Sequence, residues 1–186
     1  MVQEWLDALR EVNETPWQPV GGVGAAGLGL FFLLVACFEG ATHPAWVPLL
    51  DSVNLVFHEA GHPLFGILPG ATVALLGGTL LQLAVPLVTA AAFWWRRQTA
   101  GFGFALFWHF QNFHPIGTYM ADARAQELPL VGGGEHDWGT LFEQWGCLAR
   151  DVDIGRVVIA LGWLGMLGAA AWVGWRWRRG PGEAEG

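Results

Sequence analysis

The sequence predicts an all-α integral membrane protein, a polytopic bundle of about five transmembrane helices with a short interfacial helix at its amino terminus. Of the 186 residues, 53% are hydrophobic and only 13% are charged, whereas soluble domains carry about 25% charged residues. Several apolar runs are long enough to cross a bilayer, and tryptophans gather near the ends of these runs. We expect one domain over residues 1–179, followed by a disordered tail at 180–186.

The interfacial helix is predicted for residues 1–15. Val2, Trp5 and Leu9 fall on one helical face, and acidic residues fall on the other. Such an amphipathic helix lies along a membrane surface. A frayed soluble tail is the alternative.

The predicted transmembrane helices follow from apolar runs bounded by charged or aromatic residues. The first run is rich in glycine and alanine, which allows close helix packing. The segment 122–150 is too polar to cross a membrane and is predicted to be a surface loop with a short helix beginning near Asp137. The five predicted spans are 20–38, 46–68, 71–95, 100–121 and 154–175.

The charged residues bear on partners and on orientation. A net charge of −7 without a single lysine argues against a nucleic-acid partner. Cys37 and Cys147 lie far apart, so no CxxC metal site or disulfide framework is predicted. Five spans would place Arg10, Arg124, Arg150 and Arg156 on one side and Arg96, Arg97, Arg176, Arg178 and Arg179 on the other. The positive-inside rule then favours an outer amino terminus and an inner carboxyl terminus.

The second predicted span contains the sequence VFHEAGHPLFG, which has the pattern H-E-x-x-H. His58 and His62 are four residues apart, so a helix places both imidazoles on one face. Glu59, one helical step away, is then suitably placed to take a proton from a metal-bound water. Ionisable residues inside a membrane helix are costly and generally functional. The motif therefore predicts a zinc site, with a polar patch for helix packing as the alternative.

The polar residues of this span form a single stripe. Asp51 and Asn54 lie on the same helical face as the motif, so we expect the stripe to face the interior of the bundle. Asn54, one turn before His58, is a candidate for orienting that histidine. Pro63 follows the motif directly and predicts a kink.

Zinc requires a third protein ligand. The residues leave several candidates open, and His43 and His109 are better explained as a surface histidine and a core histidine. Asp137 is either a ligand or the N-cap of the short helix. His136 is either a ligand or a group that stabilises an oxyanion. The candidates are His43, His109, His114, Asp122, His136 and Asp137.

An H-E-x-x-H motif in a membrane helix resembles the site-2 protease group, the M50 intramembrane zinc metalloproteases. That family adds an N-x-x-P element and a later L-D-G aspartate, which Asn112, Pro115 and Asp122 resemble, although Ala123 replaces the glycine and the spacing is longer. The resemblance covers about residues 54–122 and implies Asp122 as the third zinc ligand, ahead of His136. Family members act near the cytoplasmic face, whereas the arginines place this motif near the outer face.

These observations predict an intramembrane zinc metalloprotease. His58, His62 and Asp122 or His136 would hold Zn²⁺, and Glu59 would act as the general base. The expected partners are the lipid bilayer and a membrane-spanning protein substrate, and the expected location is a bacterial inner membrane. The alternatives are a zinc-dependent lipid amidase, a non-proteolytic zinc-binding membrane protein and a structural partner subunit.

Overall fold

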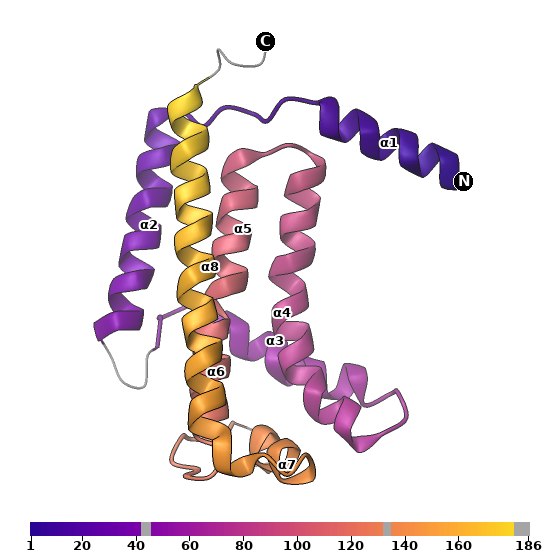
Figure 1. Ribbon diagram of the computed structural model, residues 1–186, viewed down its shortest axis with the longest axis vertical. Coiled ribbons are helices and arrows are strands. Elements are labelled where there is room, and N and C mark those ends of the chain that lie inside the picture. Colours follow the sequence, from indigo (N-terminus) through magenta and orange to yellow (C-terminus); the bar gives the residue numbers. More distant parts are fainter. Residues whose placement is uncertain (42–45, 132–134, 181–186) are drawn as a thin grey trace.

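The structure is a computed structural model that describes residues 1–41, 46–131 and 135–180. Within these ranges the chain forms helices joined by short connections, as expected for an all-α protein (Figure 1). The predicted tail at 180–186 falls outside the described residues apart from Gly180, and His43 falls outside them as well. The helices are α1 (Val2–Glu14), α2 (Gly22–Ala41), α3 (Leu50–Phe65), α4 (Ala71–Trp95), α5 (Thr99–Gln111), α6 (Phe113–Ala121), α7 (Asp137–Gln144), a 3₁₀ turn η1 (Leu148–Arg150) and α8 (Asp151–Arg179).

Three of these helices are long and apolar enough to cross a membrane. They are α2, α4 and the continuous helical segment Leu148–Arg179, which contains α8. The predicted count of five spans is not confirmed, because the other two predicted spans are shorter helices. The span 46–68 is the 16-residue α3, and the span 100–121 is divided into α5 and α6.

The division between α5 and α6 has a local cause. Pro115 has no backbone N–H, and its ring conflicts with the carbonyl of Gln111, one turn earlier. α5 ends at Gln111, and the chain begins α6 at Phe113. Pro115 therefore divides the helix, and Asn112 lies at the junction.

The two ends of the described chain lie at the same end of the bundle (Figure 1). Contacts in the described residues agree with this arrangement. Arg97, in the turn between α4 and α5, donates to Val12 O and to Asn13 Oδ1, the latter at 2.9 Å. Trp17 packs edge-on against Trp172 near the end of α8, with ring centroids 5.0 Å apart.

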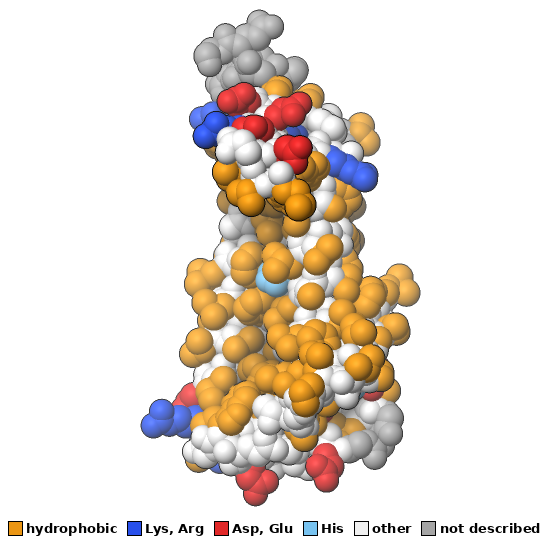
Figure 2. Space-filling model, turned by 90° about the vertical axis from the view of Figure 1, so that its right-hand side faces the viewer, with side chains coloured by type: hydrophobic (Ala, Val, Ile, Leu, Met, Phe, Trp, Pro, Cys, Tyr) orange, Lys and Arg blue, Asp and Glu red, His pale blue; other side chains and the backbone are white. Residues whose placement is uncertain are grey.

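The surface separates into an apolar middle and charged ends. In Figure 2 apolar side chains cover most of the height of the visible face, and acidic and basic side chains gather near its two extremes. α1 contributes no buried residue, and its Val2, Trp5 and Leu6 are exposed. This pattern suits a molecule whose middle meets lipid and whose α1 lies along the interface.

Close packing joins α3 to α4 at two glycines. A Cβ added at Gly61 would collide with the carbonyl oxygen of Gly77. Side chains larger than hydrogen would therefore push the two helices apart. This crossing holds the polar face of α3 against the inner face of α4.

Buried polar side chains connect the helices in the interior. Asp51 Oδ1 accepts from Gln111 Nε2 at 2.7 Å, and Asn54 Oδ1 accepts from the Trp108 indole at 2.7 Å. Glu39 of α2 lies 3.1 Å from His114 of α6 and accepts from Gln111 at 2.9 Å. The prediction that Asp51 and Asn54 face the interior is confirmed.

Candidate metal centre

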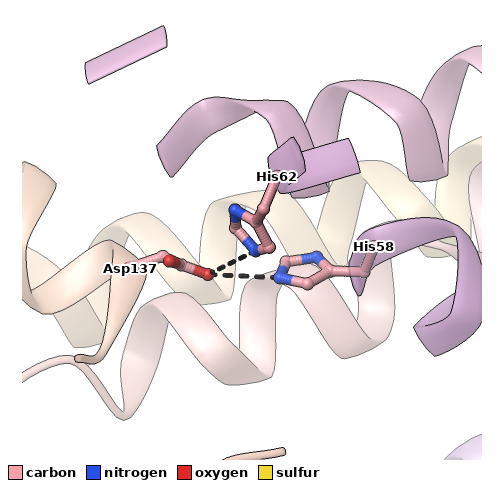
Figure 3. Close-up of side chains that lie close together, drawn as sticks. All are labelled: His58, His62 and Asp137. Atoms are coloured by element: carbon pink, nitrogen blue, oxygen red, sulfur yellow. Dashed lines mark hydrogen bonds and ion pairs between the residues drawn. The ribbon is translucent and has the colours of Figure 1, made fainter. Parts of the chain in front are cut away.

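The two motif histidines converge on one carboxylate. His58 Nε2 lies 3.2 Å and His62 Nε2 lies 3.3 Å from the same oxygen, Asp137 Oδ2. Figure 3 shows both rings turned toward Asp137, which begins α7. Among the described residues, these three form the group that could hold a metal ion, with their ligand atoms within 4.8 Å of one another.

The separations fit a tetrahedral zinc ion. Zinc binds histidine nitrogen and carboxylate oxygen at about 2.0–2.2 Å, which puts two ligands of a tetrahedron roughly 3.3–3.6 Å apart. The nitrogen–oxygen separations of 3.2 and 3.3 Å lie just below this range and at its lower edge. A small outward adjustment of the carboxylate would accommodate the ion.

The second nitrogen of each ring is already bonded. His62 Nδ1 lies 3.0 Å from the carbonyl oxygen of Ala74, and His58 Nδ1 lies 3.1 Å from Gln82 Oε1. A carbonyl oxygen can only accept, so the proton of neutral His62 is on Nδ1, and its Nε2 carries a lone pair. The same assignment for His58 follows from the amide oxygen of Gln82.

The centre therefore brings together three hydrogen-bond acceptors. Two Nε2 lone pairs and the Asp137 oxygen face one another, and none of the three supplies a proton in the neutral-histidine state. A cation at the common point satisfies all three at once. A histidine with its outer nitrogen bonded to an oxygen is also the usual arrangement of a zinc ligand.

Gly78 leaves room beside these nitrogens. A Cβ built on Gly78 would come within 2.7 Å of His62 Nε2 and 2.8 Å of His58 Nε2. A glycine is therefore required on the α4 side of the centre if an ion is to fit. Two observations therefore indicate that these residues fit a metal ion: the set of ligand atoms and the space beside Gly78.

Asp137 is held in place by its neighbours rather than by capping its own helix. The N-cap of α7 is His136, whose Nδ1 accepts from Gly139 N at 3.0 Å. Asp137, which was considered for this role, is the first residue of the helix. The Asp137 backbone N–H donates to the Tyr119 hydroxyl at 3.1 Å. The Tyr119 ring also packs on the His136 ring, with centroids 4.1 Å apart.

Asp137, rather than Asp122 or His136, lies together with the two motif histidines. Asp122 follows the last residue of α6 and accepts from the backbone N–H groups of Glu127 and Leu128 at 2.9 and 3.1 Å. His136 Nε2 lies 3.5 Å from Asp122 Oδ2. Burial lowers the pKa of His136, and the Asp122 carboxylate opposes this effect. Both residues instead brace the loop that delivers Asp137.

Glu59 lies beside the centre and is half-buried. It lines the same cavity as His58, His62 and Asp137, a space of about 610 Å³. Most other lining side chains are apolar, among them Trp46, Leu55, Leu75, Ile116, Leu128 and Leu130. The cavity thus combines a carboxylate beside the candidate metal centre with walls that suit an apolar ligand.

The remaining histidine candidates lie elsewhere. His109 Nδ1 lies 3.1 Å from the carbonyl oxygen of Leu83, among aromatic rings. His114 is paired with Glu39. Asn54 does not contact His58 in the predicted way, because its amide is bonded to Asp51, Gln111 and Trp108. Gln82 contacts His58 instead. The sequence offered one indication of this role, because Gln82 is the only amide side chain in the apolar run 71–95.

No protein-family model, curated protein or solved structure matches the chain.

Proposed function

We propose that this chain is an intramembrane zinc metalloprotease in which His58, His62 and Asp137 hold the ion. The observation that carries the proposal is the convergence of two histidine Nε2 atoms and one carboxylate oxygen, all acceptors, beside a glycine that leaves space for an ion. A bound zinc would supply a Lewis acid that lowers the pKa of water to about 7. Three protein ligands leave one position open for that water.

Glu59 is the general base in this proposal. Glu59 follows His58 in the sequence, and its side chain lines the same cavity as the proposed ligands. It would accept a proton from the attacking water and return it to the departing amine nitrogen of a peptide. Tyr119 and Asp137 share a hydrogen bond through the Asp137 backbone N–H, so Tyr119 keeps the third ligand oriented.

The substrate proposed is a membrane-spanning protein segment. The three long apolar helices support a place in a membrane, and the cavity walls are chiefly apolar. A membrane helix must unwind before its backbone can reach the centre, because its carbonyls are bonded within the helix. The proposed location is the bacterial inner membrane.

A second candidate function uses the same centre. The apolar cavity also fits the acyl chain of a lipid amide, which would make the protein a zinc-dependent lipid amidase. A non-proteolytic zinc-binding protein would share the ligands but would not need Glu59. Substrate chemistry and the Glu59 requirement separate the three functions.

The decisive experiment compares purified wild type with Glu59→Gln, using Glu143→Gln as a matched control on the exposed face of α7. Zinc content is measured first, and cleavage is then followed on model transmembrane peptides and on N-acyl amides. We expect about one zinc per chain in all three proteins and peptide cleavage in all but Glu59→Gln. Full cleavage by Glu59→Gln, or cleavage of the N-acyl amides alone, would overturn the protease assignment, and a wild type that binds no zinc would overturn the metal centre.

A further inference from the structure

A chain of buried hydrogen bonds runs from the α5–α6 junction to His58. Asn112 Nδ2 donates to the carbonyl oxygen of Trp108 at 3.0 Å. Gln82 Nε2 donates to Asn112 Oδ1 at 2.9 Å, and Gln82 Oε1 lies 3.1 Å from His58 Nδ1. The chain thus connects α5, α4 and α3 in sequence.

The direction of every bond follows from the first one. The Trp108 carbonyl can only accept, so the NH₂ group of Asn112 must face it and the Asn112 oxygen must face Gln82. Gln82 then has to present its NH₂ group to Asn112 and its oxygen to His58. That oxygen requires a proton on His58 Nδ1, which leaves the Nε2 lone pair facing Asp137.

Burial keeps water from replacing these bonds. Asn112 is 0% exposed, and Gln82 is 5% exposed. Reversing either amide would leave two acceptors or two donors face to face without solvent, at a cost of about 1–3 kcal/mol for each unsatisfied group. The orientation of both amides is therefore locked by the fold.

The two histidines differ in how they are held. His62 bonds to the backbone carbonyl of Ala74, which no substitution of a side chain removes. His58 depends on two amide side chains in series. Substitution of Gln82 or Asn112, neither of which is a proposed ligand, would therefore change the ring orientation and tautomer of His58.

We propose that Gln82 and Asn112 are positioning residues that set the tautomer of His58 for metal binding. The inference rests on the proposed metal role of His58. It also gives the α5–α6 junction a role in the site, because the break caused by Pro115 places Asn112 where it reaches both Trp108 O and Gln82.

The test uses full-length protein in detergent and four variants. Gln82→Leu removes the acceptor for His58, and Asn112→Leu removes the group that orients Gln82. Gln82→Glu keeps an acceptor toward His58 but removes the donor toward Asn112, so it isolates the bond to His58. Gln111→Leu is the matched control, because Gln111 is an equally buried amide of α5 that bonds to Asp51 and Glu39 instead.

Two readouts are combined, namely zinc affinity and the ¹⁵N NMR tautomer of His58 in metal-free protein. We expect affinity to fall about 10–100-fold in Gln82→Leu, less in Asn112→Leu, and little in Gln82→Glu and Gln111→Leu. The wild type is expected to show the Nδ1-protonated tautomer, and Gln82→Leu a mixture. Zinc binding in the wild type together with unchanged affinity and tautomer in Gln82→Leu would overturn this inference and leave the proposed function standing. An equal loss in Gln111→Leu would show general loosening of the bundle and would overturn it as well. Absence of zinc from the wild type would instead defeat the proposed function.

Discussion

The Asp137 carboxylate and the His58 imidazole lie 79 positions apart in the sequence and 3.2 Å apart in the structure. This contact joins α7, which lies at the end of the bundle, to the buried face of α3. Of the two aspartates considered as ligands from the sequence, Asp122 and Asp137, only Asp137 lies in the group with His58 and His62.

The first prediction concerns that selection. Asp137→Ala is expected to lose stoichiometric zinc, because a three-ligand site becomes a two-ligand site. Asp122→Ala is expected to keep it with reduced affinity, since Asp122 only braces the loop through the backbone N–H groups of Glu127 and Leu128. Metal analysis after dialysis measures both. Retention in Asp137→Ala together with loss in Asp122→Ala would restore Asp122 as the ligand.

The second prediction concerns the space beside the ligands. Gly78→Ala would bring a methyl group within 3 Å of both Nε2 atoms, so we expect zinc binding to be abolished while the bundle still folds. Gly168→Ala is the control, because a Cβ there meets nothing within 4 Å. Zinc titration and thermal unfolding separate the two effects. Wild-type zinc affinity in Gly78→Ala would mean that the ion does not occupy this space.

The third prediction concerns a buried pair away from the centre. His114→Leu leaves the Glu39 carboxylate without its partner at 3.1 Å, and both side chains are buried. Removing one member of a buried pair costs about 3–5 kcal/mol, so we expect a clear loss of thermal stability. Asp153→Asn, which breaks the exposed pair with Arg156, is expected to change stability by less than about 1 kcal/mol. The double variant Glu39→Leu with His114→Leu should recover part of the loss, and equal effects of the two single variants would contradict this account.

The fourth prediction concerns orientation. The shared end of the two termini collects Arg10, Arg96, Arg97, Arg176, Arg178 and Arg179, whereas Arg124, Arg150 and Arg156 lie toward the other end. The positive-inside rule then predicts both termini in the cytoplasm, in place of the outer amino terminus expected from five spans.

Single cysteines test this in a background with Cys37 and Cys147 replaced by serine. We expect a membrane-impermeant thiol reagent to label a cysteine at Glu127 in whole cells. Cysteines at Glu4 and Arg178 should react only after permeabilisation. Labelling of just one of these two terminal positions would indicate an odd number of crossings.

Local patterns were sufficient to predict the helical class, the interior-facing stripe of α3 and the pairing of His58 with His62. These features depend on hydrophobicity and on helical periodicity within a few turns. The break at Pro115 was also predictable, because proline acts on the backbone of its own segment.

The position of Asp137 beside the two histidines was not predictable in the same way. Asp122, His136 and Asp137 all lie within reach of the same end of the bundle, and only the hydrogen bonds of the loop decide which carboxylate turns inward. The proposed role of Gln82 depends on the contact between α4 and the α5–α6 junction. Hydrophobic periodicity does not predict which helices contact one another, so the sequence did not indicate this role. The span count was not predictable from the apolar runs, because α3 has only 16 residues and the run 100–121 is divided into α5 and α6.

The shared end of the two termini has a practical consequence. Under the proposed topology, an affinity tag or fused reporter at either terminus would be separated from the candidate metal centre by most of the height of the bundle (Figure 1). Such fusions should leave the cavity open. An insertion between Asp122 and His136 would instead act directly on the loop that presents Asp137, which makes this loop the place to install an engineered switch.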